Sequence, residues 1–319
     1  MSLIDADLLI DNVSQVVTCA GPAPKRGAAL ADAGVIPGGA VAVAGGVIVA
    51  VGPAADVRAR VRARATLDAG GRALIPGLID CHTHAVFAGD RAGEFALRAA
   101  GASYQAIAAA GGGIVATTAP TRAASIAQLT ALALALLERA RGFGTTTIEI
   151  KTGYDLTIPG ELRLLDVIAA AAAATPIAVV PTLLCHLVPA ERRADRDAYV
   201  RELCEALVPQ ARGRATSVDV YCDDGAFTRA ETAQLLGAAR AHGLDVRGHV
   251  GQFTDQGAAE LIAELGGRSV DHLEQVSAAG IAALARAGTI AVMLPGACVQ
   301  LRLCLLYTSD AADEEDSVD

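Results

Sequence analysis

The sequence predicts an α/β protein: a TIM-type (β/α)8 barrel that is missing the eighth strand, preceded by a small β-sandwich-like domain. Three observations predict this fold. Strand-like and helix-like segments alternate over most of the chain, polar residues stand at the ends of several strand-like runs, and the first part contains only short strands between turns. The 319 residues, 53% of them hydrophobic, are enough for one large barrel and an accessory domain.

The N-terminal part, residues 1–74, is predicted to form the small β domain. One strand is expected at 8–19, with the sequence LLIDNVSQVVTC. A hairpin is expected at 40–53, where the pair Gly45-Gly46 separates two apolar runs. We expect this domain to be incomplete, because the C-terminal strands that would complete it are missing from the sequence.

The barrel is predicted over residues 75–302, also incomplete. Its first strand lies in the run 73–84, which is apolar and ends in polar residues, as expected of a buried parallel strand. Six more strands are predicted at 145–154, 177–186, 217–224, 244–250, 268–273 and 289–295, with helical patterns such as 125–144 and 228–243 between strands. A doubly wound sheet is the alternative, and it is disfavoured because no glycine-rich phosphate loop follows the first strand.

The alternation of strands and helices stops after Pro295, and we expect no further helix-strand unit there. The chain then ends in an acidic run that contains Asp310, Asp313, Glu314, Glu315, Asp316 and Asp319. Such a run is expected to be disordered. We interpret residues 303–319 as a non-native tail that follows native sequence ending near Arg302; a natural acidic tail is the alternative.

Composition excludes several classes of protein. A net charge of -9 argues against nucleic-acid binding, which needs a clustered positive surface. The seven cysteines are scattered and never spaced as CxxC, which disfavours a disulfide framework or zinc knuckle. The uncharged stretch 167–190 is cut by three prolines into pieces too short to span a membrane, and no signal peptide is visible. We expect a cytoplasmic protein that binds neither nucleic acid nor membrane; a homodimer is left open.

Histidines at predicted strand ends indicate a metal site. His82 and His84 are two residues apart, so both imidazoles point to the same side and can reach one divalent ion. His249 and His272 end two later strands, where a third ligand and a non-ligand base would lie, and His186 ends another. Each alone is compatible with an ordinary core histidine. Together they favour a catalytic metal centre with an open coordination position.

Several motifs extend this pattern. In order along the chain they are PGLIDCHTH, HTHAVFAGDR, GASYQAI, AAGGGI, EIKTGY, HVGQ, SVDHLE and GTIAVMLPG. On these motifs the chain resembles the amidohydrolase superfamily and, within it, the imidazolonepropionase family. The resemblance runs from the N-terminal strands to about Arg302, and the superfamily supplies the barrel type.

The resemblance implies a role for each matching residue. The metal ligands would be His82, His84 and His249, with one divalent metal, zinc or iron. The catalytic residue that assists proton transfer would be His272. The group that binds the substrate carboxylate would be Arg91, Tyr104 and Tyr154; this agrees with charge, because arginine can grip a carboxylate in bidentate fashion. The residues that hydrogen-bond the substrate ring would be His186 and Gln252.

The activity that the resemblance implies is hydrolysis of the cyclic amide C–N bond of 4-imidazolone-5-propanoate, a small anionic imidazolone, by a metal-activated water. The product would be N-formimidoyl-L-glutamate, in histidine degradation. Two alternatives stay open. One is a related deaminase of cyclic amidines or nucleobases in the same superfamily. The other is an inactive metal-binding fragment, because the barrel is predicted to be incomplete.

The chain departs from the family pattern in two places. The family has a fourth metal ligand, an aspartate that ends the eighth strand, and no equivalent is present. We therefore expect the 319-residue chain to be poorly soluble and essentially inactive, unless Asp271 or an acid of the tail replaces that ligand. In addition, Cys185-His186 stands where the family usually has Ala-His.

Overall fold

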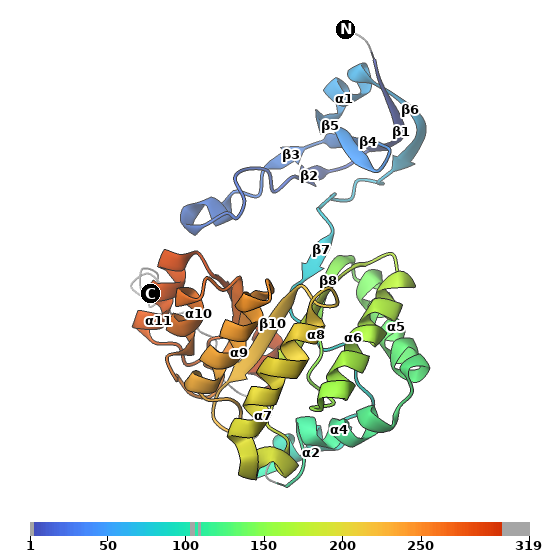
Figure 1. Cartoon of the computed structure of the whole chain (residues 1–319). Coiled ribbons are helices and arrows are strands. Elements are labelled where there is room, and N and C mark those ends of the chain that lie inside the picture. Colours follow the sequence, from blue (N-terminus) through green and yellow to red (C-terminus); the bar gives the residue numbers. More distant parts are fainter. Residues whose placement is uncertain (1–2, 103–105, 108–109, 302–319) are drawn as a thin grey trace. The chain divides into compact units, whose positions relative to one another are not determined.

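The computed structural model describes residues 3–102, 106–107 and 110–301 (Figure 1). It divides into two compact units, one ending at Leu78 and the other starting at Ile79. The division therefore falls a little after residue 74, the boundary that the sequence predicted. The predicted tail 303–319 lies outside the described residues.

The N-terminal unit is built on a four-stranded sheet. Its strands are β1 (Ile4–Asp11), β4 (Gly39–Ala44), β5 (Val47–Pro53) and β6 (Val61–Asp68). They lie in the order β5-β4-β1-β6, with β1 parallel to β6 and antiparallel to β4. Helix α1 (Ala54–Arg60) buries Val57 against Ala6, Leu9, Ala40 and Ala42. This apolar cluster is the core of the unit.

The predicted hairpin is confirmed, but the single strand predicted at 8–19 is wrong. Strands β4 and β5 pair Ala44 with Val47 across Gly45 and Gly46, both at positive φ as a two-residue turn requires. The expected strand 8–19 is divided into β1 and β2 (Gln15–Val17), because Asn12 adopts a left-handed φ of 54°. Strand β2 pairs with β3 (Val35–Pro37), and a short 3-10 helix, η1 (Gly27–Ala31), lies between them in sequence.

The second unit contains a seven-stranded sheet. Its strands are β7 (Leu78–Asp80), β8 (Thr145–Lys151), β9 (Ala178–Cys185), β10 (Ser217–Cys222), β11 (Asp245–Val250), β12 (Ser269–His272) and β13 (Ile290–Val292). They lie side by side in the order of the sequence, and every pair from β8 to β13 is parallel. The predicted strands and their parallel order are confirmed, and the fold is of the β/α barrel type.

Helices connect the strands and pack against them. They are α2 (Ala92–Ala99), α4 (Ile114–Ala123), α5 (Ile126–Gly142), α6 (Ile158–Ala173), α7 (Arg196–Glu202), α8 (Val208–Ala211), α9 (Arg229–Ala241), α10 (Ala258–Glu264), α11 (Ala278–Ala287) and α12 (Pro295–Leu301), with a 3-10 turn at Ala190–Asp195 and a π turn at Leu203–Leu207. Both helices singled out in the sequence form, and each begins with a capping box, Ser125 with Gln128 and Thr228 with Glu231. Helices α6 and α9 lie against β9 and β10 (Figure 1).

Helix α12 runs from Pro295 to Leu301, and within the described residues no further strand follows it, so the expected absence of another helix-strand unit beyond Leu301 stays a prediction. Proline at the first turn is compatible with a helix, because its missing N–H would have no partner there. Within the described part of the chain, no helix has the length and apolar character needed to span a membrane.

Candidate active site

The histidines predicted to form the site all lie at one edge of the seven-stranded sheet. His82 and His84 follow strand β7, His186 follows β9, His249 lies in β11 and His272 is the last residue of β12. The carboxyl ends of parallel barrel strands meet at the same face. The strand order therefore brings together residues that are far apart in the sequence.

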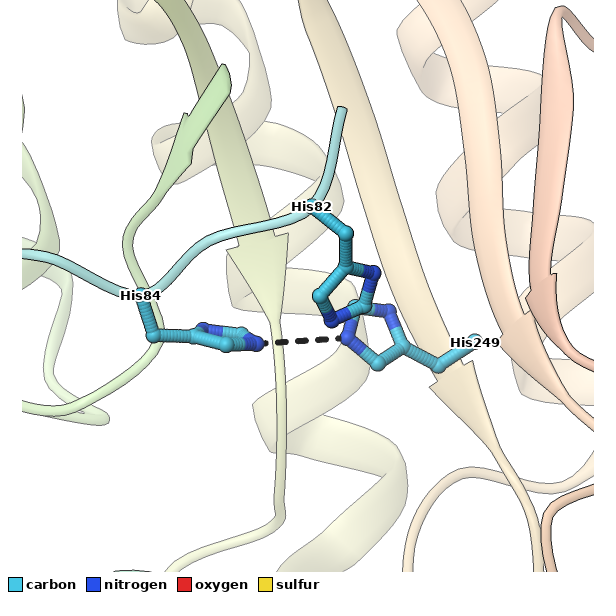
Figure 2. Close-up of side chains that lie close together, drawn as sticks. All are labelled: His82, His84 and His249. Atoms are coloured by element: carbon cyan, nitrogen blue, oxygen red, sulfur yellow. Dashed lines mark hydrogen bonds between the residues drawn. The ribbon is translucent and has the colours of Figure 1, made fainter. Parts of the chain in front are cut away.

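His82, His84 and His249 are the closest group (Figure 2). One nitrogen from each ring lies within 4.8 Å of the other two. The Nε2 atoms of His84 and His249 face each other at 3.5 Å, and the ring centroids of His82 and His249 are 4.6 Å apart. Figure 2 shows the three rings converging on one point from two segments of the chain.

Hydrogen bonds to carboxylates orient two of these rings. Nδ1 of His82 lies 2.7 Å from Oδ2 of Asp271, and Nδ1 of His249 lies 3.0 Å from Oδ1 of Asp219. Because the carboxylates accept, each Nδ1 carries the proton and each Nε2 keeps its lone pair. Asp271, which the sequence offered as a replacement fourth ligand, thus contacts His82 itself.

The donor set fits a divalent metal. Burial lowers the pKa of His249 to about 4 and holds that of His84 well below its ordinary value, so both imidazoles are neutral near pH 7. The Nδ1 atom of His84 is buried without a hydrogen-bond partner in the described structure, and its Nε2 faces another lone pair. A divalent metal ion binds neutral imidazole nitrogens through their lone pairs, and here these lone pairs face one another with no N–H group between them.

His272 lies beside this group. Its ring centroid is 5.6 Å from that of His82 and 5.4 Å from that of His249. Both His272 and Leu273 have left-handed φ angles, 81° and 73°, a strained conformation for residues other than glycine. His272 lies on the cavity wall at the end of β12. Its Nδ1 atom is 3.5 Å from Oε1 of Glu274.

The histidines open into a cavity of about 450 Å³. Its wall is formed by His82, His84, Arg91, Arg98, Ile114, Tyr154, His186, Tyr221, His249, Gln252, His272, Leu294, Ala297, Gln300 and Leu301. The structure therefore brings together every predicted site residue that it describes. Tyr104, predicted to bind the substrate carboxylate, lies outside the described residues.

Two arginines of the cavity wall differ in their partners. Arg91 stands at the start of helix α2 and is partly buried. Within the described part of the chain no carboxylate pairs with Arg91, whereas Arg98 lies 3.6 Å from Glu94. Arg91 thus presents an uncompensated guanidinium to the cavity, which suits an anionic ligand.

The other predicted contacts line the cavity near the histidines. Tyr154 is 5% exposed, and its ring centroid lies 5.5 Å from that of His84. Nδ1 of His186 lies 3.1 Å from the carbonyl oxygen of Gly153, and burial lowers the pKa of His186 to about 3, so its Nε2 is an acceptor. Gln252 accepts a hydrogen bond of 3.0 Å from the hydroxyl of Tyr221.

Sequence reasoning missed several residues of the site, among them Arg98 and Tyr221 on the cavity wall and Asp219 behind His249. Asp219 and Tyr221 are two residues apart on strand β10, so they point to the same side as the site. That alternation within SVDVYC was a usable signal. Arg98 lies on a helix rather than at a strand end, and no pattern in the sequence pointed to it.

Comparisons with known proteins agree with this architecture. Residues 39–60 match the model of an imidazolonepropionase-like composite domain of bacteria. Among solved structures, an adenosine deaminase from Xanthomonas campestris with bound zinc is similar with a TM-score of 0.59 and 23% identity, over 95% of this chain and 66% of that one. An ochratoxinase from A. niger has a TM-score of 0.58 and 16% identity, over 90% and 65%. At these identities the two structures show the fold alone, and the first of them holds zinc.

Curated relatives are much closer in sequence. An imidazolonepropionase from Chloroflexus aggregans is 49% identical over 302 residues, which cover 91% of this chain and 71% of that protein. Another from Symbiobacterium thermophilum is 48% identical over 297 residues, covering 91% and 70%. Since the similarity is this high over more than two thirds of both relatives, the chain belongs to the imidazolonepropionase family.

Proposed function

We propose that the cavity hydrolyses the ring C–N bond of 4-imidazolone-5-propanoate to give N-formimidoyl-L-glutamate. The main support for this proposal is that one cavity contains both the three histidine nitrogens and the guanidinium of Arg91, which no carboxylate pairs with in the described structure. The first suits a hydrolytic metal, and the second suits a substrate with a carboxylate. The two relatives described above carry the name of this activity.

His82, His84 and His249 would hold one divalent metal, for which zinc is our proposal. Imidazole nitrogens suit both zinc and iron, and zinc binds more tightly than ferrous iron in the usual affinity series. Bound there, the ion supplies Lewis-acid chemistry that makes water a nucleophile near pH 7 and polarises the ring carbonyl. Asp271 and Asp219 support the ligands by accepting from Nδ1 of His82 and His249.

His272 would move the proton. Its ring faces the cavity beside two of the proposed ligands and is not part of the three-histidine group. An imidazole there can accept a proton from the attacking water and pass it to the ring nitrogen that leaves. The carboxylate of Glu274 lies 3.5 Å from Nδ1 of this imidazole.

The substrate would be held at both ends. Arg91 would bind the propionate carboxylate, with the Tyr154 hydroxyl as a second donor; Tyr104 stays a prediction. His186 and Gln252 would contact the ring. The bond from Tyr221 to Oε1 of Gln252 fixes the amide so that its NH2 group can donate into the cavity.

The test is substrate selectivity of metal-loaded protein, measured on the 319-residue chain and on the chain extended by the eighth strand and aspartate that the resemblance implies. Because the shorter chain is expected to be essentially inactive, the comparison of substrates is made with the extended one. The proposal predicts turnover of 4-imidazolone-5-propanoate and none of neutral nucleobases, which offer nothing to Arg91. The reverse preference would favour the deaminase. A chain that holds one metal equivalent and turns over neither substrate would favour a metal-binding protein without this activity.

A further inference from the structure

A buried ion cluster lies directly behind the three-histidine group. The side chain of Lys151 is fully buried, and its Nζ lies 2.8 Å from Asp219, 2.9 Å from Glu149 and 3.0 Å from Asp271. Burial alone would lower the pKa of Lys151, but the three carboxylates raise it above its ordinary value. The residue is therefore a fixed ammonium inside the barrel, and the proposed reaction does not use it.

The strand register explains how the cluster forms. Glu149 and Lys151 are two residues apart on β8, so both point to the same face of the sheet. Asp219 lies on β10, and Asp271 lies on β12, paired in register with His249 on β11. Interior residues of barrel strands stack in layers, and these side chains meet inside the barrel next to the histidines.

The ammonium is linked to two proposed metal ligands through two carboxylates. Oδ2 of Asp271 contacts both Nζ of Lys151 and Nδ1 of His82. Asp219 contacts Lys151 through Oδ2 at 2.8 Å, while its Oδ1 accepts from Nδ1 of His249 at 3.0 Å. One cation therefore fixes the positions of both acceptors that orient the histidines.

Without the Lys151 ammonium, the negative charges of Asp219 and Asp271 would be uncompensated. Asp219 and Asp271 would face each other across a buried space, where two carboxylates repel and an uncompensated charge is costly. Their oxygens would shift, and the rings of His82 and His249 would turn with them.

We propose that Lys151 is a positioning residue of the metal centre, which holds Asp219 and Asp271 where they direct Nε2 of His82 and His249 at one ion. This inference rests on the ligand set of the proposed function. The position of Lys151 also limits how many metal ions one chain can bind. Asp219, His249 and Asp271 come close enough to hold an ion, but the ammonium already contacts both carboxylates and repels a second cation. The wild-type chain should therefore bind one equivalent of metal.

The test is the zinc affinity of Lys151→Met, which keeps the length of the side chain and removes its charge. Zinc is titrated into metal-free protein against a chelator of known affinity, and the absorption spectrum of the cobalt-loaded protein is recorded. We expect binding roughly 10- to 100-fold weaker than in the wild type, the range for loss of a group behind metal ligands. The cobalt bands should also shift, because the ligand geometry changes.

Arg196→Met is the matched control. Arg196 pairs with Glu231 away from the cavity, so its loss lowers stability without touching the ligands. Zinc affinity and the cobalt spectrum should stay as in the wild type. If Lys151→Met does not fold, Lys151→Gln, which keeps two N–H donors in the cluster, replaces it in the same comparison.

The outcomes separate this inference from the proposed function. A folded Lys151 variant with wild-type affinity and spectrum would overturn the inference while leaving the ligand set intact. Full zinc binding by His249→Ala would overturn the ligand set itself. Weaker binding with a shifted spectrum in the Lys151 variant, together with unchanged Arg196→Met, supports the positioning role.

Discussion

Arg91→Ala tests how the substrate is recognised. The proposed ion pair between Arg91 and the propionate is neither fully exposed nor fully buried, because Arg91 is partly buried on the cavity wall. Exposed pairs contribute about 0–1 kcal/mol, and breaking a buried pair costs about 3–5 kcal/mol. A loss of about 2–3 kcal/mol is therefore expected.

In kinetic terms this is a fall in kcat/KM of about 30- to 150-fold. The assay is hydrolysis of 4-imidazolone-5-propanoate by metal-loaded protein, together with the Kd of the product N-formimidoyl-L-glutamate, which needs no turnover. The metal content should not change, because Arg91 is not among the three histidine donors.

Arg98→Ala is the matched control, since it removes another arginine of the same wall that already pairs with Glu94. A smaller loss is expected there. If Arg91→Ala leaves both kcat/KM and the product Kd unchanged, the carboxylate does not bind at Arg91 and the deaminase becomes the better hypothesis.

Three further predictions concern catalysis and stability. His272→Asn should lower kcat by about 10²- to 10⁴-fold without changing the metal content, and an unchanged kcat would remove His272 from proton transfer. Gly160→Ala should lower the free energy of unfolding in urea by about 1–3 kcal/mol, because the added Cβ would lie 1.8 Å from Cγ of Asp155. The control is Gly237→Ala in α9, where a Cβ meets nothing within 4 Å, and this change should stabilise the protein. Burial lowers the pKa of His186 to about 3. Below pH 6.5 this imidazole is therefore protonated in the unfolded chain but stays neutral in the folded chain. The free energy of unfolding of the metal-free protein should fall by about 2 kcal/mol between pH 6.5 and 5 because of His186. In His186→Gln the free energy of unfolding should depend less on pH, and an identical pH dependence in the variant would refute the role of His186.

Much of the fold could be predicted because its signals are local. Each barrel strand is an apolar run that ends in polar residues, and the parallel order follows from the alternation with helices. The division of the expected strand 8–19 could not be predicted, since it depends on the left-handed conformation of Asn12 alone. Helix α12 was not predicted, although Pro295 stands at its first turn, a position that proline tolerates well.

The site was predictable where its residues end strands. His82, His84, His186, His249 and His272 lie together as their positions at strand ends indicated. The cluster around Lys151 was not predicted, because it depends on which residues of β8, β10 and β12 point inward at the same level. That register is a property of the whole seven-stranded sheet and not of any single segment.

The zinc content of the wild-type chain and of His249→Ala, measured after dialysis against trace zinc, tests the proposed metal site. His249 is buried, and its Nε2 lies 3.5 Å from that of His84, so the variant loses a donor from the centre of the group. We expect one equivalent in the wild type and none in the variant, with the circular dichroism spectrum unchanged. A full equivalent retained by His249→Ala would contradict the proposed metal site, and with it the hydrolysis derived from it.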